Sequence, residues 1–156
     1  MVVSLTASFD NSIDQMNSKN STYTGFKFEE DGFPAYAIIN KDLKNFENRF
    51  DYQYAVFIGV VPIEYNENGH PEGEEYDYLL DVEKAIIQEI EVEGETLHVG
   101  HTTLSLKREM IFYTKVPDKV EEYLNAYLPT INRDSSFDIS EDPEWENVEG
   151  FYEMMD

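Results

Sequence analysis

Three histidines are the side chains of this sequence best suited to acid–base or metal chemistry near neutral pH: His70, His98 and His101. His98 and His101 lie three residues apart in a predicted strand, so they face opposite sides unless a β-bulge realigns them. Realigned beside a carboxylate, they could bind zinc. The plainer interpretation is that they are polar residues on a strand surface. Cysteine is absent, which excludes disulfides and thiolate chemistry.

Charged and aromatic residues near these histidines define one candidate pocket. A buried Arg108 needs a carboxylate partner, and Glu83 is a candidate for that role. As an alternative to this structural role, the same side chains could line a functional pocket. The predicted pocket residues are Glu83, His98, His101, Arg108 and Tyr113.

A calcium-loop pattern follows the most apolar predicted strand. The spacing resembles D-x-[DN]-x-[DN]-G-x5-E with Glu in the first position, and oxygen ligands would come from Glu64, Asn66, Asn68 and Glu75. Pro71 and the preceding strand count against this site, and an ordinary turn explains the same residues. No phosphate-binding glycine loop, G-x-S-x-G or H-E-x-x-H motif is present, so no cofactor or resident metal is predicted.

Acidic residues dominate the composition. The 156 residues contain 33 Asp and Glu against 11 Lys and Arg, which gives a net charge of −22. This charge repels nucleic-acid phosphates and anionic membranes, so neither is predicted as a direct partner. Hydrophobic residues at 41% and aromatic residues at 14% favour a folded globule over a disordered chain. The length predicts a single domain over residues 1–156.

The negative charge is concentrated in two stretches without Lys or Arg, residues 50–83 and 134–156. Charge runs are often only solvated surface. The sharper hypothesis is an acidic face that docks a basic protein partner, attracted over long range. The residues predicted for that face are Glu72, Glu74, Glu75, Asp77, Glu144, Glu146 and Glu149.

Hydrophobic periodicity predicts the elements that must position these residues. Strands are expected near 2–9, 23–28, 35–39, 54–63, 96–106, 110–115 and 136–140, with a loop over 10–21 and a bulge near 100–103. Helices are expected near 42–49, 74–91, 117–129 and from Asp142 onward. This order predicts an α+β fold with a ferredoxin-like βαββαβ antiparallel sheet and helices on one face. An N-terminal strand and hairpin and a C-terminal helix extend it.

The N-terminus carries no basic residue ahead of its apolar stretch, and no apolar run approaches the roughly 18 residues of a membrane span. We therefore expect a cytoplasmic protein without a secretory signal.

Several motifs resemble those of the bacterial domain of unknown function family 695. They are N-G-H-P at 68–71 before the acidic pair 74–75 and L-L-D-V-E at 79–83, V-G-H-T-T at 99–103, R-E-M-I-F-Y at 108–113, and D-P-E-W at 142–145 with Phe151-Tyr152 after it. The resemblance covers about residues 23–152 and leaves 1–22 as a peripheral strand and linker. It implies no established activity.

Members of that family are sometimes joined to a domain similar to the ribonuclease E inhibitor family, which implies a regulatory or protein-binding role. Together with the charge, this favours a non-catalytic module that binds a basic protein. One alternative is an acidic mimic that inhibits a ribonuclease or another nucleic-acid enzyme. The other is a small enzyme or metal-binding protein that uses the His/Arg/Glu pocket.

Overall fold

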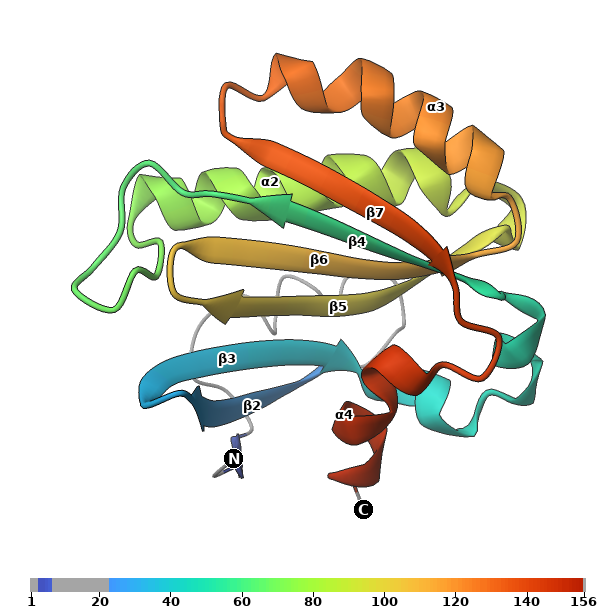
Figure 1. The fold of residues 1–156 in the computed structure, drawn as a ribbon, viewed down its shortest axis with the longest axis horizontal. Coiled ribbons are helices and arrows are strands. Elements are labelled where there is room, and N and C mark those ends of the chain that lie inside the picture. The colour runs from blue at the N-terminus through green and yellow to red at the C-terminus, as the bar shows by residue number, and fades with distance from the viewer. Residues whose placement is uncertain (1–2, 7–22, 156) are drawn as a thin grey trace.

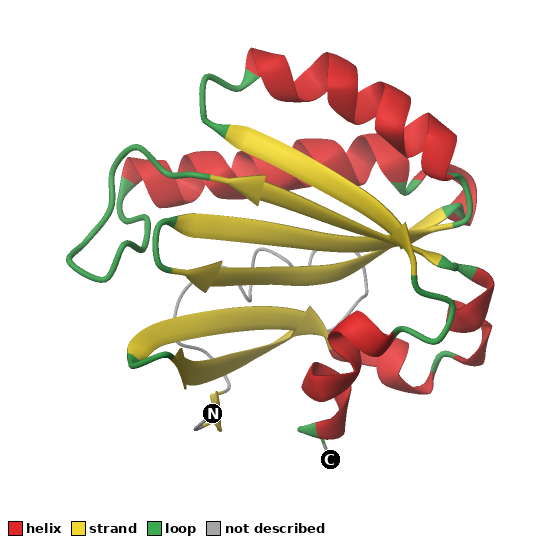
Figure 2. Ribbon diagram, viewed as in Figure 1, coloured by secondary structure: helices red, strands yellow, loops and turns green. Residues whose placement is uncertain are grey.

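The protein forms one antiparallel sheet covered by helices on both faces (Figures 1 and 2). The structure is a computed structural model that describes residues 3–6 and 23–155. Its seven strands lie in the order β1-β2-β3-β5-β6-β4-β7, and every neighbouring pair is antiparallel. The strands are β1 (Val3–Thr6), β2 (Tyr23–Glu30), β3 (Phe33–Asn40), β4 (Tyr54–Val60), β5 (Thr96–Leu104), β6 (Lys107–Thr114) and β7 (Ser135–Glu141).

The predicted hairpin around Asp31-Gly32 is confirmed as β2 and β3. Both turn residues have positive φ, 53° and 84°, as a tight two-residue hairpin turn requires. β3 then joins the rest of the sheet through β5. Part of the predicted first strand is present as β1, whereas residues 7–9 and the predicted loop over 10–21 lie outside the described residues.

Two long helices cover one face of the sheet, α2 (Glu74–Ile90) and α3 (Pro117–Tyr127). Leu79 and Ile86 of α2 and Leu124 of α3 pack on Ile58 and Phe112 from the sheet. Both helices agree with the predicted ranges, because their apolar residues recur at the spacing that forms one helical face. Short 3-10 helices occupy Lys41–Asn45, Glu47–Asp51, Val92–Gly94 and Leu128–Thr130. The first two replace the helix predicted over 42–49.

The C-terminal segment packs on the opposite face (Figure 1). The prediction of a continuous helix from Asp142 onward is wrong, because Trp145 has left-handed backbone geometry with φ 60°. A 3-10 turn, η6 (Glu146–Val148), and a short helix, α4 (Glu149–Glu153), follow it. The predicted apolar spacing nevertheless identifies buried side chains: Trp145, Val148, Tyr152 and Met155 all belong to the core on this face.

The structure confirms the α+β class and the antiparallel sheet. The sheet has more strands than the four of a ferredoxin-like unit, because the β2–β3 hairpin widens it beyond β5. Within the described residues, no helix has both the length and the apolar character needed to cross a bilayer.

Candidate ligand pocket and buried histidine cluster

A β-bulge in β5 brings His98 and His101 to the same face of the sheet. His98 pairs with Phe112 and Gly100 with Ile111, so Val99 is the extra residue that shifts the register. The bulge depends on Gly100, whose φ is 150° and whose hypothetical Cβ would lie 1.9 Å from the Ile38 carbonyl oxygen. The predicted irregularity is therefore present, just before the predicted range, and it realigns the two histidines as their spacing required.

Glu83 of α2 lies between the two histidines. Its Oε2 accepts a 2.7 Å hydrogen bond from His98 Nε2, and its Oε1 lies 2.7 Å from His101 Nδ1. The Tyr23 hydroxyl lies 2.7 Å from His98 Nδ1, on the far side of that ring. All four side chains are buried. We refer to this group, Tyr23, Glu83, His98 and His101, as the Glu83 cluster.

The contacts of the cluster determine where its protons lie. Burial raises the pKa of Glu83, but its close contacts with His101 and His98 more than reverse this, so its pKa lies well below the usual range. The ionised carboxylate accepts from His98 Nε2–H and faces a proton on His101 Nδ1. Burial raises the pKa of Tyr23, so its hydroxyl stays protonated and donates to His98 Nδ1.

His101 is thereby left with one ring nitrogen that the cluster does not use, Nε2. Burial lowers the pKa of His101, and the nearby Arg108 cation lowers it further, so Nε2 carries no proton near neutral pH. A carboxylate behind a histidine fixes the tautomer and makes the outer nitrogen more basic, as in metal sites and catalytic dyads. His101 can therefore accept a hydrogen bond or a proton at Nε2.

His101 lines a pocket of about 520 Å³ near the start of α2. Its walls come from several elements: Tyr36 of β3, Thr103 of β5, Arg108 of β6, His70 of the loop before α2, and Tyr76 of α2. The pocket is charged at two depths. His101 and Arg108 are almost wholly buried, whereas Glu72 and Asp77, which also line it, are exposed.

Arg108 is held in a fixed orientation by neighbouring side chains. Its Nε donates a 2.9 Å hydrogen bond to Thr103 Oγ1, and its Cζ lies 5.5 Å from the centroid of the Tyr76 ring. Glu83, which we predicted as its partner, is instead bonded to the histidines. A guanidinium fixed in this way binds carboxylate or phosphate groups through parallel hydrogen bonds.

The loop predicted to bind calcium is built as a turn that supports the pocket. Asn66 Oδ1 accepts from the backbone N–H groups of Asn68 and His70, at 2.9 and 3.1 Å. His70 Nε2–H then donates to the Pro34 carbonyl at 3.0 Å. Glu75 does not join this loop, because Arg133 binds its carboxylate at 2.6 and 2.8 Å. Residues 3–6 and 23–155 hold no group of three or more His, Asp or Glu arranged for a metal.

Of the five predicted pocket residues, His101 and Arg108 line this cavity. Glu83 and His98 are buried and do not line it, and neither does Tyr113, so this part of the predicted site is wrong. Strand alternation places residues five apart on opposite faces, so Tyr113 points away from the side that Arg108 occupies. Its hydroxyl donates to Asp142 Oδ2 at 2.6 Å, and its ring stacks on Trp145 with centroids 4.0 Å apart. Tyr113 therefore anchors the C-terminal segment.

The predicted acidic residues do not form one docking face. Val60, after which the chain leads to α2, pairs with Ser135, whereas Tyr54 pairs with Glu141 at the other end of β4. Glu72, Glu74, Glu75 and Asp77 therefore lie at one end of the sheet, and Glu144, Glu146 and Glu149 follow the other end, on the opposite face. Binding of a basic partner stays a prediction, but no single surface holds both acidic groups.

Sequence reasoning missed several side chains of the site. Tyr23 and Thr103 carry no local motif, and their contacts with His98 and Arg108 depend on strand register. His70 is one of the three candidate histidines, but its position in the predicted calcium loop gives no sign that it lines the same pocket as His101 and Arg108. The sequence signal that could place His98 and His101 together is the change in apolar alternation along β5, which predicts a bulge between them.

The fold and the pocket define an α+β protein whose sheet and α2 enclose a carboxylate–histidine cluster beside a fixed arginine. Residues 24–152 match the model of the Family of unknown function (DUF695), and the chain belongs to this family. This match confirms the resemblance in the motifs. No curated protein and no solved structure gives a significant match.

Proposed function

We propose that the pocket binds a small molecule through an anionic group that contacts Arg108 and His101. The observation that carries this proposal is that both side chains are buried, are held by Thr103 and Glu83 respectively, and line the same cavity. Small-molecule sites typically combine such a cavity with a few fixed polar groups. The protein would thus act as a ligand-binding module.

The two depths of charge indicate the class of ligand. An acid group fits the inner end, where Arg108 supplies the cation. The exposed carboxylates Glu72 and Asp77 at the outer end favour amine or hydroxyl donors over a second acid group. Amino acids and hydroxy acids have this arrangement, with an acid at one end and hydrogen-bond donors near it.

Binding of an anion should be coupled to protonation of His101. Among the described residues, the charged and titratable groups that shift its pKa are Glu83 from α2, His98 from its own strand and Arg108 from β6, and His70, Tyr76, Glu72 and Asp77 line the same pocket. In the free pocket burial and Arg108 lower the pKa of His101. A bound anion offsets the Arg108 charge and accepts a hydrogen bond from Nε2–H, so the pKa of His101 rises. Affinity should therefore increase as the pH is lowered from 8 towards 6.

A thermal-shift panel of amino acids, hydroxy acids, inorganic phosphate and simple amines tests this function. We expect acids with nearby donors to raise the melting temperature of the wild type, since a ligand that binds only the folded state stabilises it. Arg108→Met should abolish the shift. The matched control is Arg133→Met, which removes an arginine that binds Glu75 outside the pocket.

A stabilising acid that acts equally on wild type and Arg108→Met would contradict the proposal, as would stabilisation by amines alone. Arg108→Lys keeps the charge without the planar fork, and it should bind more weakly than wild type.

A finer description of the fold also belongs to this proposal. We infer that β4, β5, β6 and β7 with α2 and α3 correspond to a ferredoxin-like unit. The succession strand-helix-strand-strand-helix-strand and the spatial order β5-β6-β4-β7 support this. In this description the pocket lies where the added β3 meets the unit's β5 edge.

A further inference from the structure

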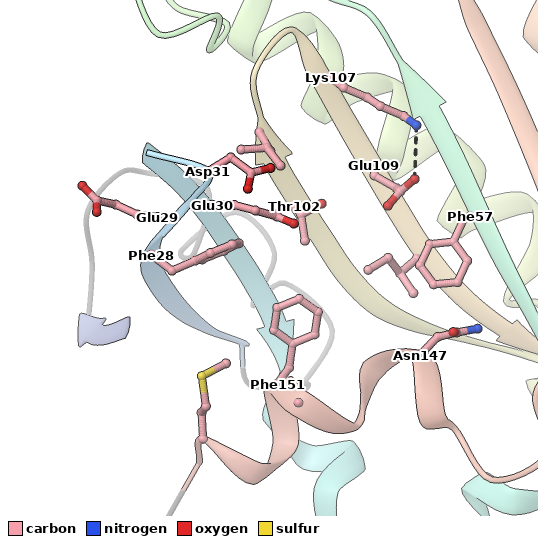
Figure 3. Close-up of a pocket in the computed structure, with 14 residues that line it drawn as sticks. Phe28, Glu29, Glu30, Asp31, Phe57, Thr102, Lys107, Glu109, Asn147 and Phe151 are labelled. Atoms are coloured by element: carbon pink, nitrogen blue, oxygen red, sulfur yellow. Dashed lines mark ion pairs between the residues drawn. The ribbon is translucent and has the colours of Figure 1, made fainter. Parts of the chain in front are cut away.

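A second cavity of about 790 Å³ lies on the face of the sheet opposite α2 (Figure 3). It extends from the tip of the β2–β3 hairpin across β5 and β6 to α4. Its apolar floor comes from both the sheet and the C-terminal segment: Phe28, Phe57, Leu104, Ile111, Phe151 and Met154. We call this cavity the hairpin groove.

The floor of the hairpin groove is only partly covered by protein. Phe57, Leu104, Phe151 and Met154 pack against the core on this face, yet each remains partly exposed. In Figure 3 the rings of Phe57 and Phe151 lie on different sides of the groove. Apolar surface of this kind is stabilised when a partner's apolar side chain covers it.

Carboxylates surround the apolar floor. Glu30, Asp31 and Glu109 line the groove, and Figure 3 shows Glu30 and Asp31 directed towards Thr102 while Glu29 points away. Lys107 is the basic residue among the described lining residues. Its Nζ lies 3.4 Å from Glu109 Oε2, so that pair is balanced. The hairpin end of the groove therefore carries an excess of negative charge.

We propose that the hairpin groove binds an amphipathic basic segment of a protein partner. An apolar side chain of that segment would lie between Phe57 and Phe151, and a neighbouring Lys or Arg would pair with Glu30 and Asp31. The occupant is inferred from charge complementarity, since an acidic rim on a chain of net charge −22 attracts cations and repels acidic peptides. This surface is separate from the ligand pocket and does not depend on its function.

A fluorescein-labelled peptide of twelve alternating Lys and Leu residues is a suitable probe. Its binding is measured by fluorescence anisotropy at 150 mM salt, where long-range attraction between exposed charges is largely screened. Two peptides of equal length serve as controls, one alternating Glu and Leu and one alternating Lys and Ser. We expect the Lys–Leu peptide to bind more tightly than either, because the groove needs both features.

The decisive comparison uses a double variant, Glu30→Gln with Asp31→Asn, which keeps a turn-forming residue before Gly32. It should bind the Lys–Leu peptide about three- to tenfold more weakly, as expected for two partly exposed charge pairs. Glu121→Gln with Glu122→Gln neutralises two exposed carboxylates on α3, across the sheet, and should bind like wild type. Phe151→Ala should weaken binding while its unfolding remains cooperative.

Equal affinities of the two double variants would overturn the proposal, because binding would then follow total charge. Equal binding of the Lys–Ser peptide would overturn it as well. A concentration-dependent dimer that Phe151→Ala dissociates would show that a second copy of the chain occupies the groove, and this too would refute a basic partner.

Discussion

Replacing Glu83 with Gln removes one charge from the centre of the buried cluster at almost constant volume. The carboxylate is fully buried and lies 2.7 Å from both His98 Nε2 and His101 Nδ1. Hydrogen bonds to charged groups contribute about 1.5–3 kcal/mol each. The amide oxygen can still accept from one ring, but the amide NH₂ then faces the N–H of the other.

A buried donor left without an acceptor costs about 1–3 kcal/mol, and removing one member of a buried charge network costs about 3–5 kcal/mol. We therefore expect Glu83→Gln to lower the free energy of unfolding by about 3 kcal/mol at pH 7. For a chain of this size each kcal/mol corresponds to about 2–4 °C, so the melting temperature should fall by about 6–12 °C.

Urea unfolding followed by fluorescence of the single tryptophan, the buried Trp145, measures this difference. Glu89→Gln changes an exposed residue of the same helix and should stay within about 0.5 kcal/mol of wild type. Because the folded protein holds the pKa of Glu83 below 4.5, its stabilisation is present above pH 4.5 and is lost as the pH falls through the folded pKa. A Glu83→Gln protein within 1 kcal/mol of wild type at pH 7 would refute the reasoning.

Three further predictions concern the elements around the site. Gly100→Ala should lower the free energy of unfolding by more than about 3 kcal/mol or prevent folding, because its Cβ would overlap the Ile38 carbonyl. The control Gly150→Ala, whose Cβ meets no atom within 4 Å, should be neutral or slightly stabilising in urea titrations. Asp142→Ala removes the acceptor for Glu146 N–H, Asn147 N–H and the Tyr113 hydroxyl. It should therefore lower the free energy of unfolding by about 2 kcal/mol. A change below about 0.5 kcal/mol would contradict the role of Asp142 in anchoring the C-terminal segment. Burial raises the pKa values of Tyr23, Tyr113 and Tyr152, so these groups stabilise the fold below pH 10 and lose that effect as the pH rises. Absorbance at 295 nm should show them ionising together with alkaline unfolding, whereas gradual titration before unfolding would argue against their burial.

The elements with strong periodicity were predictable from the sequence. α2 and α3 carry apolar residues at helical spacing, and the Asp31-Gly32 step specifies the β2–β3 turn. The C-terminal segment shows the limit of such patterns. Its buried residues follow helical spacing, yet Asp142 accepts hydrogen bonds that stop the chain in a turn and place Trp145 in a left-handed conformation.

The site was predictable only in part, because strand register decides which side chains meet. His98, His101 and Glu83 converge since Val99 is bulged out, and the pattern of leucines and valines around Gly100 indicated a bulge. The R-E-M-I-F-Y motif does not by itself separate Tyr113 from Arg108, because only the alternation of side chains along β6 places the two on opposite faces. The proximity of His70 to Arg108 depends on a loop conformation set by Asn66, which no spacing rule describes.

The tautomers of the three histidines test the account most directly. Long-range ¹H–¹⁵N spectra of the histidine rings at pH 7.5 should show His70 and His98 protonated at Nε2 and His101 protonated at Nδ1, because their acceptors are the Pro34 carbonyl and the two Glu83 oxygens. Addition of the acid that gives the largest thermal shift should add a second proton to His101 alone. A free His101 protonated at Nε2, or an unchanged His101 ring in the presence of that acid, would contradict the proposed site.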